Sequence, residues 1–530
     1  MRDFQLAGRS PVYATNGMAA TSMPAATLTA IDVLRAGGNA LDAAVAAVAL
    51  LGVVEPQSTG IGGDCFCLYK PAGRPVVAIN GSGRAPSAIS VEALTRLGVT
   101  SLEPESAHCV TVPGALAAWE LLLAHHGRKG LDELLRPAIQ AAEEGFVVAP
   151  RVAFDWAEAA PKLRRTGAVS FLRGGAALQP GDLFRQPALA QTFRHVARDG
   201  ATAFYDGEIA ARTVAMLRAR GGLHTEADFA AMPAAVDFVT PITRRWRGYD
   251  VWECPPNGSG LLVLMLLGIL EGMPVLDDPL SPQRLHRHAE AGRLVYRDRD
   301  ALLCDPTQNF VPMDRLLSDR YLDAMRALIR DDAAMAALPA GGETMLPAHQ
   351  DTVYVSVVDR DGNACSFINS IFQNFGSGLL VEQDGIMLHN RGFSFSLEPG
   401  HPNAIAPNKR PMHTIIPGML TRDGEAVMPF GVMGGHYQPF GQSWFLSNLL
   451  EYGMDIQEAL DCPRILPRLG KLQVEHGVSA AARHALAGLG HVLTEPEEPL
   501  GGGQAIWIDR DRGILVGGSD PRKDGCALGY

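Results

Sequence analysis

The sequence predicts an α+β fold whose helices and strands are largely segregated along the chain. Apolar residues recur at helical spacing in several segments before residue 300, whereas short apolar or alternating runs of strand type gather after residue 350. The sequence Asp361-Gly362-Asn363 lies between two alternating runs, which is typical of a β-hairpin turn. These observations predict sheets packed against helices, with no internal repeat.

Start and stop signals delimit the expected helices. Thr21-Ser22 followed by Pro24 begins the first helix, and Gly37-Gly38 ends it before Asn39 caps an alanine-rich second helix. The small residues of both helices predict close packing against a sheet. The expected helices are residues 25–34, 40–51, 115–126, 131–144, 186–197, 209–219, 261–270 and 286–300.

The helix at residues 286–300 carries many charges, and we expect it to present a solvated face. His286 and His288 are two residues apart, so they do not share a helix face and do not predict a metal site.

A glycine-rich loop precedes the first of the expected strands. Gly60 to Gly63 lies between a helix and a strand and lacks the Lys and hydroxyl residues of a phosphate-binding loop, so nucleotide binding is not predicted. The expected strands are residues 65–69, 76–80, 352–359, 364–369, 385–389, 414–420, 426–432, 471–474, 505–509 and 514–517.

Composition narrows the possible partners. The 530-residue chain has a net charge of -11, which argues against binding to nucleic acids or anionic membranes. The longest apolar run, residues 43–54, is too short to cross a bilayer, and the N-terminus shows no secretory signal. The eight cysteines are scattered and form no disulfide framework. We therefore expect a cytoplasmic protein that acts on a small molecule, without nucleic-acid or membrane partners.

Short motifs occur in one order along nearly the whole chain. They are Gly37 to Ala44, Pro56-Gln57, Gly62-Gly63, Val112-Pro113-Gly114, Pro255 to Gly260, Asp351-Thr352, Ser356 to Asp359, Asp361 to Ala364, Phe375 to Gly378, Pro407 to Arg410 and Gly434-Gly435. Together they resemble the gamma-glutamyltranspeptidase family of N-terminal nucleophile hydrolases. The resemblance implies a four-layer αββα sandwich, with two stacked, mainly antiparallel sheets between helical layers.

The resemblance also implies that the chain cuts itself between Asp351 and Thr352. Residues 1–351 would form a large subunit and residues 352–530 a small one, intertwined in one structural domain. Thr352 would be the nucleophile, and its new α-amine, with a pKa of about 7.7–8.0, would be the base. The family pattern assigns the hydroxyl partner to Ser370 and the oxyanion donors to Gly434 and Gly435. No cofactor or metal is expected.

Other positions depart from the family pattern for a gamma-glutamyl group. Arg84 adjoins Ala85-Pro86 directly instead of preceding it by two or three residues, and the acidic residue that would bind an α-ammonium appears as Ser394. Further expected substrate-binding residues are Tyr354, Phe372, Arg391, His413, Thr414 and His436. Arg84 and Arg391 suit a carboxylate, and the short connection 399–407 favours water as the acceptor.

Three functions remain open from the sequence. The first is hydrolysis of an amide with a small carboxylate-bearing acyl group, as in the oxamate amidohydrolase branch. The second is gamma-glutamyl hydrolysis or transfer on glutathione-like donors, and the third is a non-catalytic homologue. The expected assembly is a heterodimer of the two fragments or a dimer of such heterodimers.

Overall fold

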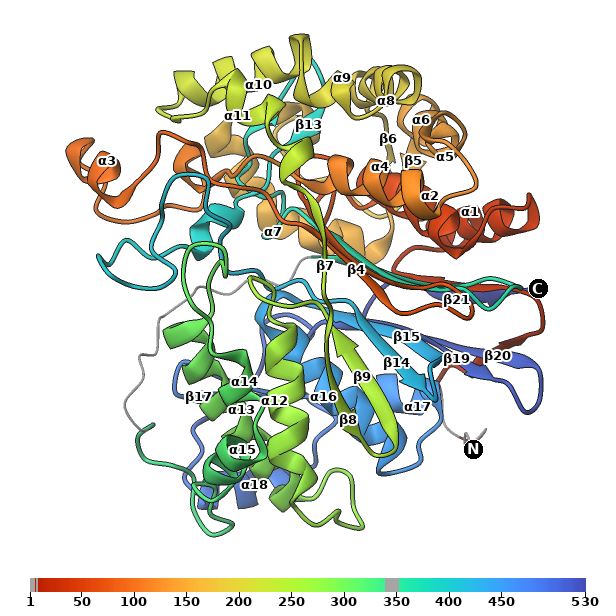
Figure 1. The fold of residues 1–530 in the computed structure, drawn as a ribbon, viewed down its shortest axis with the longest axis vertical. Helices are drawn as coiled ribbons and strands as arrows, with labels where there is room; N and C mark the ends of the chain where they lie inside the picture. The colour runs from red at the N-terminus through yellow and green to blue at the C-terminus, as the bar shows by residue number, and fades with distance from the viewer. Residues whose placement is uncertain (1–4, 6–7, 339–351) are drawn as a thin grey trace.

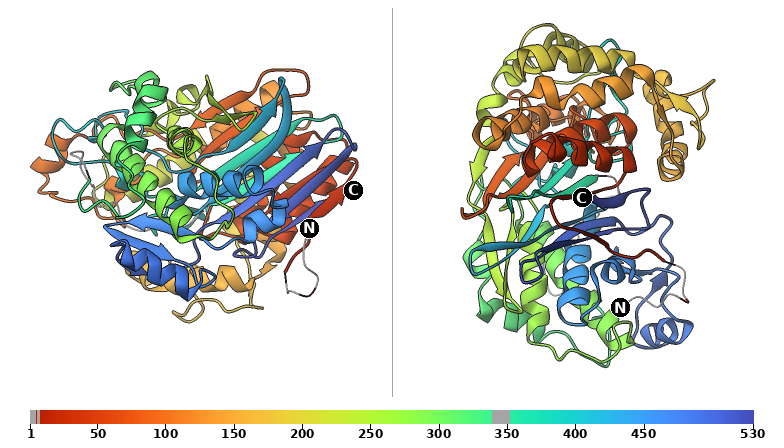
Figure 2. Two further views of the ribbon diagram at one scale, coloured as in Figure 1. Left: turned by 90° about the horizontal axis from the view of Figure 1, so that it is seen from below. Right: turned by 90° about the vertical axis from the view of Figure 1, so that its right-hand side faces the viewer.

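The structure, a computed structural model, describes residues 5, 8–338 and 352–530. Two β-sheets lie face to face, with one group of helices on the outer side of each (Figure 1). The right-hand view of Figure 2 shows the same order of helices, sheet, sheet and helices. The αββα sandwich implied by the sequence is therefore confirmed.

Each of the two large sheets has seven strands within the described residues, and the strand pairs in both are antiparallel. The first sheet has the order β21 (Cys526–Gly529), β2 (Met18–Thr21), β10 (Val353–Val358), β11 (Ala364–Ser370), β3 (Asp64–Lys70), β4 (Val77–Gly81) and β7 (Asp237–Val239). The second has the order β1 (Val12–Ala14), β20 (Ile514–Ser519), β19 (Gly502–Asp509), β15 (Glu425–Met433), β14 (Gly418–Arg422), β9 (Tyr249–Glu253) and β8 (Ile242–Trp246).

The helices form two groups. The group on the side of the first sheet comprises α1 (Pro24–Arg35), α2 (Ala40–Val54), α3 (Val91–Arg96), α4 (Ala115–His126), α5 (Leu131–Leu134), α6 (Arg136–Glu144), α7 (Pro150–Thr166), α8 (Pro187–Asp199), α9 (Thr202–Tyr205), α10 (Glu208–Ala219) and α11 (Glu226–Ala230). The other group comprises α12 (Gly260–Glu271), α13 (Pro282–Leu302), α14 (Met313–Leu316), α15 (Asp319–Arg326), α16 (Gln438–Leu450), α17 (Ile456–Asp461) and α18 (Ala480–Gly488).

Short elements complete the fold. The small sheets contain β5 (Phe146–Val147) and β6 (Leu183–Phe184), β12 (Leu380–Val381) and β13 (Ile386–Met387), and β16 (Ile465–Arg468), β17 (Lys471–Val474) and β18 (Leu493–Thr494). Among the described residues, no helix combines the length and the hydropathy that crossing a lipid bilayer requires.

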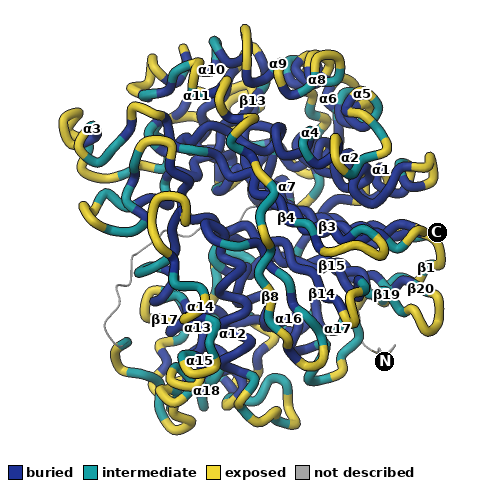
Figure 3. Tube along the Cα trace, viewed as in Figure 1, coloured by how far each residue is buried: buried dark blue, intermediate teal, exposed yellow. Residues whose placement is uncertain are grey.

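Three apolar layers hold the sandwich together. Figure 3 shows that buried residues fill the centre of the molecule and that exposed residues lie at its rim. Val353 and Val355 of β10 pack against α2 and its neighbours, whereas Tyr354 and Val358 face the second sheet. This alternation follows from the period of two along a strand. A third layer lies between the second sheet and helices such as α12 and α16.

The two expected fragments are interleaved in the first sheet. Strand β10 lies between β2 and β11, and β11 pairs in turn with β3. The predicted hairpin is confirmed: Asp359 accepts hydrogen bonds from the backbone N–H groups of Asp361 and Asn363 in the turn. The same carboxylate accepts from Ala40 N at the start of α2 (2.9 Å), which joins the two fragments.

The structure differs from the sequence-based expectations at several elements. The expectation of a solvated helix at 286–300 was wrong, because α13 is largely buried and its charges are paired, as between Arg297 and Asp298 (2.6 Å). The helix expected at 131–144 is divided at Leu135 into α5 and α6. Strands β8 and β9 and helix α16 were not predicted. Residues 339–351, which include Asp351 of the expected cut, lie outside the described residues.

Candidate active site

Thr352, Ser370 and Asp64 form a row at the ends of three neighbouring strands. Ser370 on β11 is the register partner of Asp64 on β3, and the pairing of Val353 with Asn369 places Thr352 beside Ser370. Because side chains alternate along a strand, Thr352 points to the same side as Tyr354, toward the second sheet. The fold thus brings together side chains from three distant parts of the sequence.

The Thr352 hydroxyl is buried and hydrogen-bonded. Its Oγ1 donates to Ser370 Oγ at 3.1 Å, and the side chain is 1% exposed. Ser370 Oγ also accepts from the backbone N–H of Phe372 at 2.9 Å. The Ser370 hydroxyl therefore fixes both the Thr352 hydroxyl and the backbone that follows β11.

Gly434 and Gly435 follow strand β15 of the second sheet. Their φ angles, 118° and 55°, lie in the left-handed region, which favours glycine. A Cβ on Gly434 would also lie 2.6 Å from Gly501 Cα. Strand β15 passes over β10, since the Tyr354 ring packs directly on Gly431. The Tyr354 hydroxyl itself bonds with Ser356 and Ser366 in the layer between the sheets.

Arg391 is a fully buried cation close to this row. Its Cζ lies 3.7 Å from the centre of the Phe372 ring, and its Nη1 donates to Thr414 Oγ1 at 2.9 Å. Within the described part of the chain, its Nε and Nη2 have no hydrogen-bond acceptor. Burial lowers the pKa of Arg391 to about 9, and the nearby Asp64 carboxylate opposes this shift. The guanidinium thus has two unused donors.

Asp64 is held by two histidines and by backbone. Its Oδ2 lies 2.9 Å from His413 Nε2 and 3.5 Å from His389 Nδ1, and its Oδ1 accepts from Gly83 N at 2.9 Å. Burial alone would raise the pKa of Asp64, but His389 and His413 outweigh it and hold this pKa well below the usual range. Asp64 is therefore the buried anion that balances Arg391.

His413 is held as a neutral ring. Its Nε2–H faces the Asp64 carboxylate, while Nδ1 accepts from Ile415 N at 3.4 Å. Burial and then the neighbouring Arg391 lower the pKa of His413 to about 3.

This titration predicts a loss of stability in acid. Between pH 6.5 and about pH 3 the unfolded chain binds a proton at residue 413 that the folded chain does not bind, so stability falls as pH drops. The slope from this residue reaches about 1.4 kcal/mol per pH unit. His413→Gln keeps a donor for Asp64 and does not titrate, so its melting temperature should fall less between pH 7 and pH 4. The exposed His195→Gln is the control. Equal acid slopes for wild type and His413→Gln would contradict this assignment.

Arg84, Ser394 and His436 are the remaining predicted residues. Arg84 Nη1 donates to Asn408 O at 2.8 Å and lies 3.9 Å from Asp305. Within the described residues, no hydrogen bond joins Arg84 to Arg391, the other arginine expected to bind a carboxylate. Ser394 is buried and lines a cavity of 260 Å³. His436 accepts from Arg299 Nη1 at 2.9 Å and lines a separate cavity of 710 Å³.

Sequence reasoning did not identify Asp64 and His389 as site residues. They lie in different thirds of the chain, and the hydrogen bond from His389 N to Gly62 O (3.0 Å) holds His389 beside Asp64. One feature of the sequence could have indicated Asp64: it is the first residue of an otherwise mainly apolar strand and directly follows Gly62-Gly63.

One group in the described residues has the geometry of metal ligands: His286, Glu290 and His491. Its atoms are already bonded. Glu290 accepts from Arg293 Nη1 (2.9 Å) and Met335 N (2.7 Å), and His286 bonds with His491 and with Arg330 O. The arrangement is a satisfied network that fastens residues 330–335 to α13.

The sequence matches the gamma-glutamyltranspeptidase family over residues 26–530. A Klebsiella pneumoniae protein named oxamate amidohydrolase proenzyme is 36% identical over 535 residues, covering 97% of this chain and 99% of its own. A Bacillus subtilis protein named glutathione hydrolase-like YwrD proenzyme is 35% identical, covering 94% and 95%. The crystal structure of cephalosporin acylase from Bacillus halodurans superposes with a TM-score of 0.92 at 38% identity, covering 100% and 99%.

These matches extend over both expected fragments and agree with the αββα architecture. The chain belongs to the gamma-glutamyltranspeptidase family and is an enzyme of the N-terminal nucleophile amidohydrolase type.

Proposed function

We propose that this enzyme cuts itself before Thr352 and then uses Thr352 to hydrolyse amides of small carboxylate-bearing acyl groups. The observation that carries the proposal is the buried Thr352 hydroxyl, which is hydrogen-bonded to Ser370 and lies close to Arg391, a buried arginine with unused donors. The products of the cut are residues 1–351 and 352–530, which stay together as a heterodimer.

The cut needs only groups at the junction. Thr352 Oγ1 attacks the carbonyl carbon of Asp351, the C–N bond breaks, and an ester forms while the nitrogen takes a proton. Water then hydrolyses the ester and leaves a carboxylate at Asp351 and a free α-amine at Thr352. The bond to Ser370 orients the attacking oxygen.

The same atoms carry out turnover. The α-amine of Thr352 takes the proton from its own hydroxyl as Oγ1 attacks the substrate amide carbon. The tetrahedral oxyanion accepts from the N–H groups of Gly434 and Gly435, where one donor typically contributes a factor of about 10²–10³. The C–N bond breaks, the leaving amine takes the proton, and water hydrolyses the acyl-enzyme.

The positive charge of Arg391 favours an acyl group that carries a carboxylate and no ammonium group. The unused Nε and Nη2 donors of Arg391 suit a carboxylate, which accepts two parallel hydrogen bonds from a guanidinium. The α-ammonium of a gamma-glutamyl group would instead meet a like charge, and Ser394 supplies no compensating acid. An oxamate-like acyl group, with a carboxylate and no ammonium, satisfies both conditions.

A substrate comparison tests this function. The purified protein is checked for an N-terminal Thr352 and then given oxamate and gamma-glutamyl-4-nitroanilide, with release of ammonia or nitroaniline measured. We expect kcat/KM to be higher for oxamate. Equal or faster turnover of the gamma-glutamyl donor would overturn the substrate assignment, and an intact chain would overturn the proposed cut.

Ser370 provides a test of positioning. Ser370→Ala removes the acceptor of the Thr352 hydroxyl and of Phe372 N, at a cost of about 1–3 kcal/mol for buried donors. We expect cleavage and turnover to slow about 10- to 100-fold, followed by gel time course and by kcat. Ser370→Thr keeps the hydroxyl and should stay close to wild type; if Ser370→Thr and Ser370→Ala were equally slow, the hydroxyl would have no such role.

A further inference from the structure

The loop of residues 371–378 leaves the candidate site directly after Ser370. Two of its residues that carry side chains, Phe372 and Phe375, have positive φ angles of 80° and 54°. This backbone conformation is costly for a residue with a Cβ, and it persists only where surrounding contacts hold it. The contacts that hold this loop therefore decide the geometry next to Thr352.

Helix α7, from the expected large fragment, holds the loop by hydrogen bonds. Lys162 Nζ donates to Asn374 O at 2.6 Å and to Gly376 O at 3.1 Å. Within the described part of the chain, no other hydrogen bond reaches these two carbonyl groups. Glu158, one turn earlier on the same face of α7, accepts from the Asn374 side chain at 3.2 Å. Lys162 thus fixes the peptide groups on both sides of the left-handed residues Phe375 and Gly376.

Aromatic contacts anchor the same part of the loop in the core. The Phe375 ring packs edge-on against Trp156 of α7 and against Phe171, with ring centroids 5.1 Å and 5.5 Å away. Removing the hydrogen bonds of Lys162 should therefore loosen the loop backbone without releasing the loop from the protein.

The first residues of the loop contact both parts of the candidate site. Phe372 N donates to Ser370 Oγ at 2.9 Å, and the Phe372 ring lies 3.7 Å from Arg391 Cζ. Because an aromatic face attracts a cation, the position of this ring helps to orient the guanidinium. Within the described residues, the Nε and Nη2 donors of Arg391 have no acceptor, and their direction depends on that orientation.

We infer that Lys162 is a positioning residue for the acyl carboxylate and acts through the loop on Phe372 and Arg391. The inference rests on the proposed function and deepens it, because it assigns part of the carboxylate specificity to a helix of the other fragment. Ser370 itself is held in the strand ladder between β11 and β3, so its bond to Thr352 does not depend on Lys162. Loss of Lys162 should therefore weaken carboxylate binding and leave the chemical step largely unchanged.

Lys162→Met keeps the length of the side chain and removes its donors. We expect KM for oxamate, and Kd for oxalate measured by calorimetry, to rise roughly tenfold, the scale of a lost hydrogen bond from a charged group. The kcat and the rate of the cut should change far less. Lys162→Arg can still donate to both carbonyl groups and should restore most of the binding. In an Arg391→Met background, Lys162→Met should add little, because both residues act on the same interaction.

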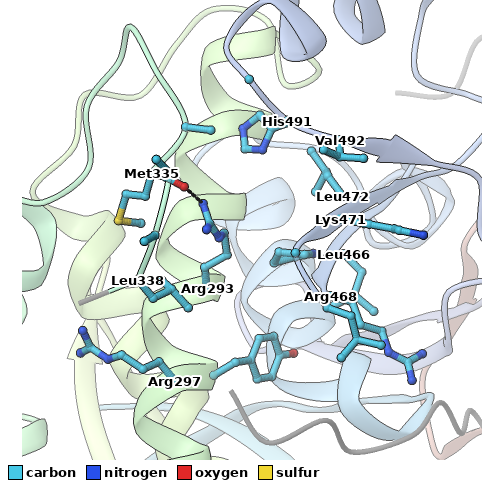
Figure 4. Close-up of a pocket in the computed structure, with 18 of the residues that line it drawn as sticks. Arg293, Arg297, Met335, Leu338, Leu466, Arg468, Lys471, Leu472, His491 and Val492 are labelled. Atoms are coloured by element: carbon cyan, nitrogen blue, oxygen red, sulfur yellow. Dashed lines mark hydrogen bonds between the residues drawn. The ribbon is translucent and has the colours of Figure 1, made fainter. Parts of the chain in front are cut away.

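Amide hydrogen exchange gives a measurement that does not depend on turnover. Residues 371–378 should exchange faster in Lys162→Met than in wild type. Arg164→Met is the matched control, because Arg164 is exposed on the same helix and donates to Gly175 O at 2.8 Å. Arg468→Met controls for the loss of one positive charge: Arg468 lines the separate 710 Å³ cavity (Figure 4), which neither Lys162 nor the loop lines. Both controls should match wild type.

Unchanged exchange of the loop in Lys162→Met would overturn the inference, as would an unchanged Kd for oxalate or a wild type that binds no oxalate. An equal rise of Kd with and without Arg391 would show that Lys162 acts by another route, and it would also overturn the inference. If wild type binds oxalate but does not hydrolyse oxamate, the proposed function fails, and the binding and exchange comparisons still decide the role of Lys162.

Discussion

Thr352→Ala should leave the protein as one uncut chain that has lost amidase activity. The substitution removes the oxygen that donates to Ser370 and that the proposed mechanism uses twice, first in the cut and then in turnover. Loss of a catalytic nucleophile costs on the order of 10⁴-fold or more in kcat. The measurement is a denaturing gel with N-terminal sequencing, together with the rate of oxamate hydrolysis.

Thr352→Ser is the matched variant, because it keeps the hydroxyl and removes only a methyl group. We expect it to cut itself more slowly and to retain measurable turnover. Melting temperatures of both variants should stay near that of wild type, since the row Thr352, Ser370 and Asp64 lies at the end of the strands. A Thr352→Ala protein that still yields the fragment 352–530 would refute the proposed nucleophile.

Arg391→Met should raise KM for carboxylate-bearing substrates far more than it changes kcat. Truncating one partner of a buried charge pair typically costs about 2–5 kcal/mol, which is roughly 30-fold or more in affinity. Methionine fills the space over the Phe372 ring without a charge, so packing is largely kept. The measurement is kcat and KM for oxamate in both proteins.

Arg391→Lys separates charge from geometry. Lysine keeps the positive charge but lacks the planar fork, so its KM should fall between wild type and Arg391→Met. A neutral acyl analogue such as acetamide should not discriminate between wild type and Arg391→Met. If KM for oxamate were unchanged in Arg391→Met, Arg391 would not be the carboxylate partner.

Local signals made part of the fold predictable. The β10–β11 hairpin followed from its Asp-Gly turn, and α2 from the Asn39 cap, which accepts hydrogen bonds from Leu41 N and Asp42 N. The sequence of helix α16 carries few features that indicate a helix. It is buried on nearly all sides, so it has no polar face to mark its period, and it contains Pro439 and Gly441. Helix α13 was misread because its charges are paired inside the protein rather than solvated.

Some residues of the candidate site could be predicted from family motifs rather than from local sequence signals. Family motifs singled out Thr352, Ser370, Gly434 and Gly435, and the structure places the first two in contact. The Asp64–His413 pair is long-range, so no local pattern reveals it. The cavity beside His436 is likewise made by α13 and β16, which are far apart in sequence.

The interleaving of β2, β10, β11 and β3 has a consequence for the stability of the enzyme after the proposed cut. Each large sheet contains strands from both fragments. Breaking the peptide bond at 351–352 would therefore create two new chain ends without dividing the protein into two independently folded domains. Pulling the pieces apart requires breaking the ladders on both sides of β10 and exposing the apolar layers on both faces of the first sheet. The mature enzyme should therefore melt in a single transition in which folding and association are lost together. Because unfolding then releases two chains, the midpoint should fall on dilution, whereas that of the uncut Thr352→Ala chain should not.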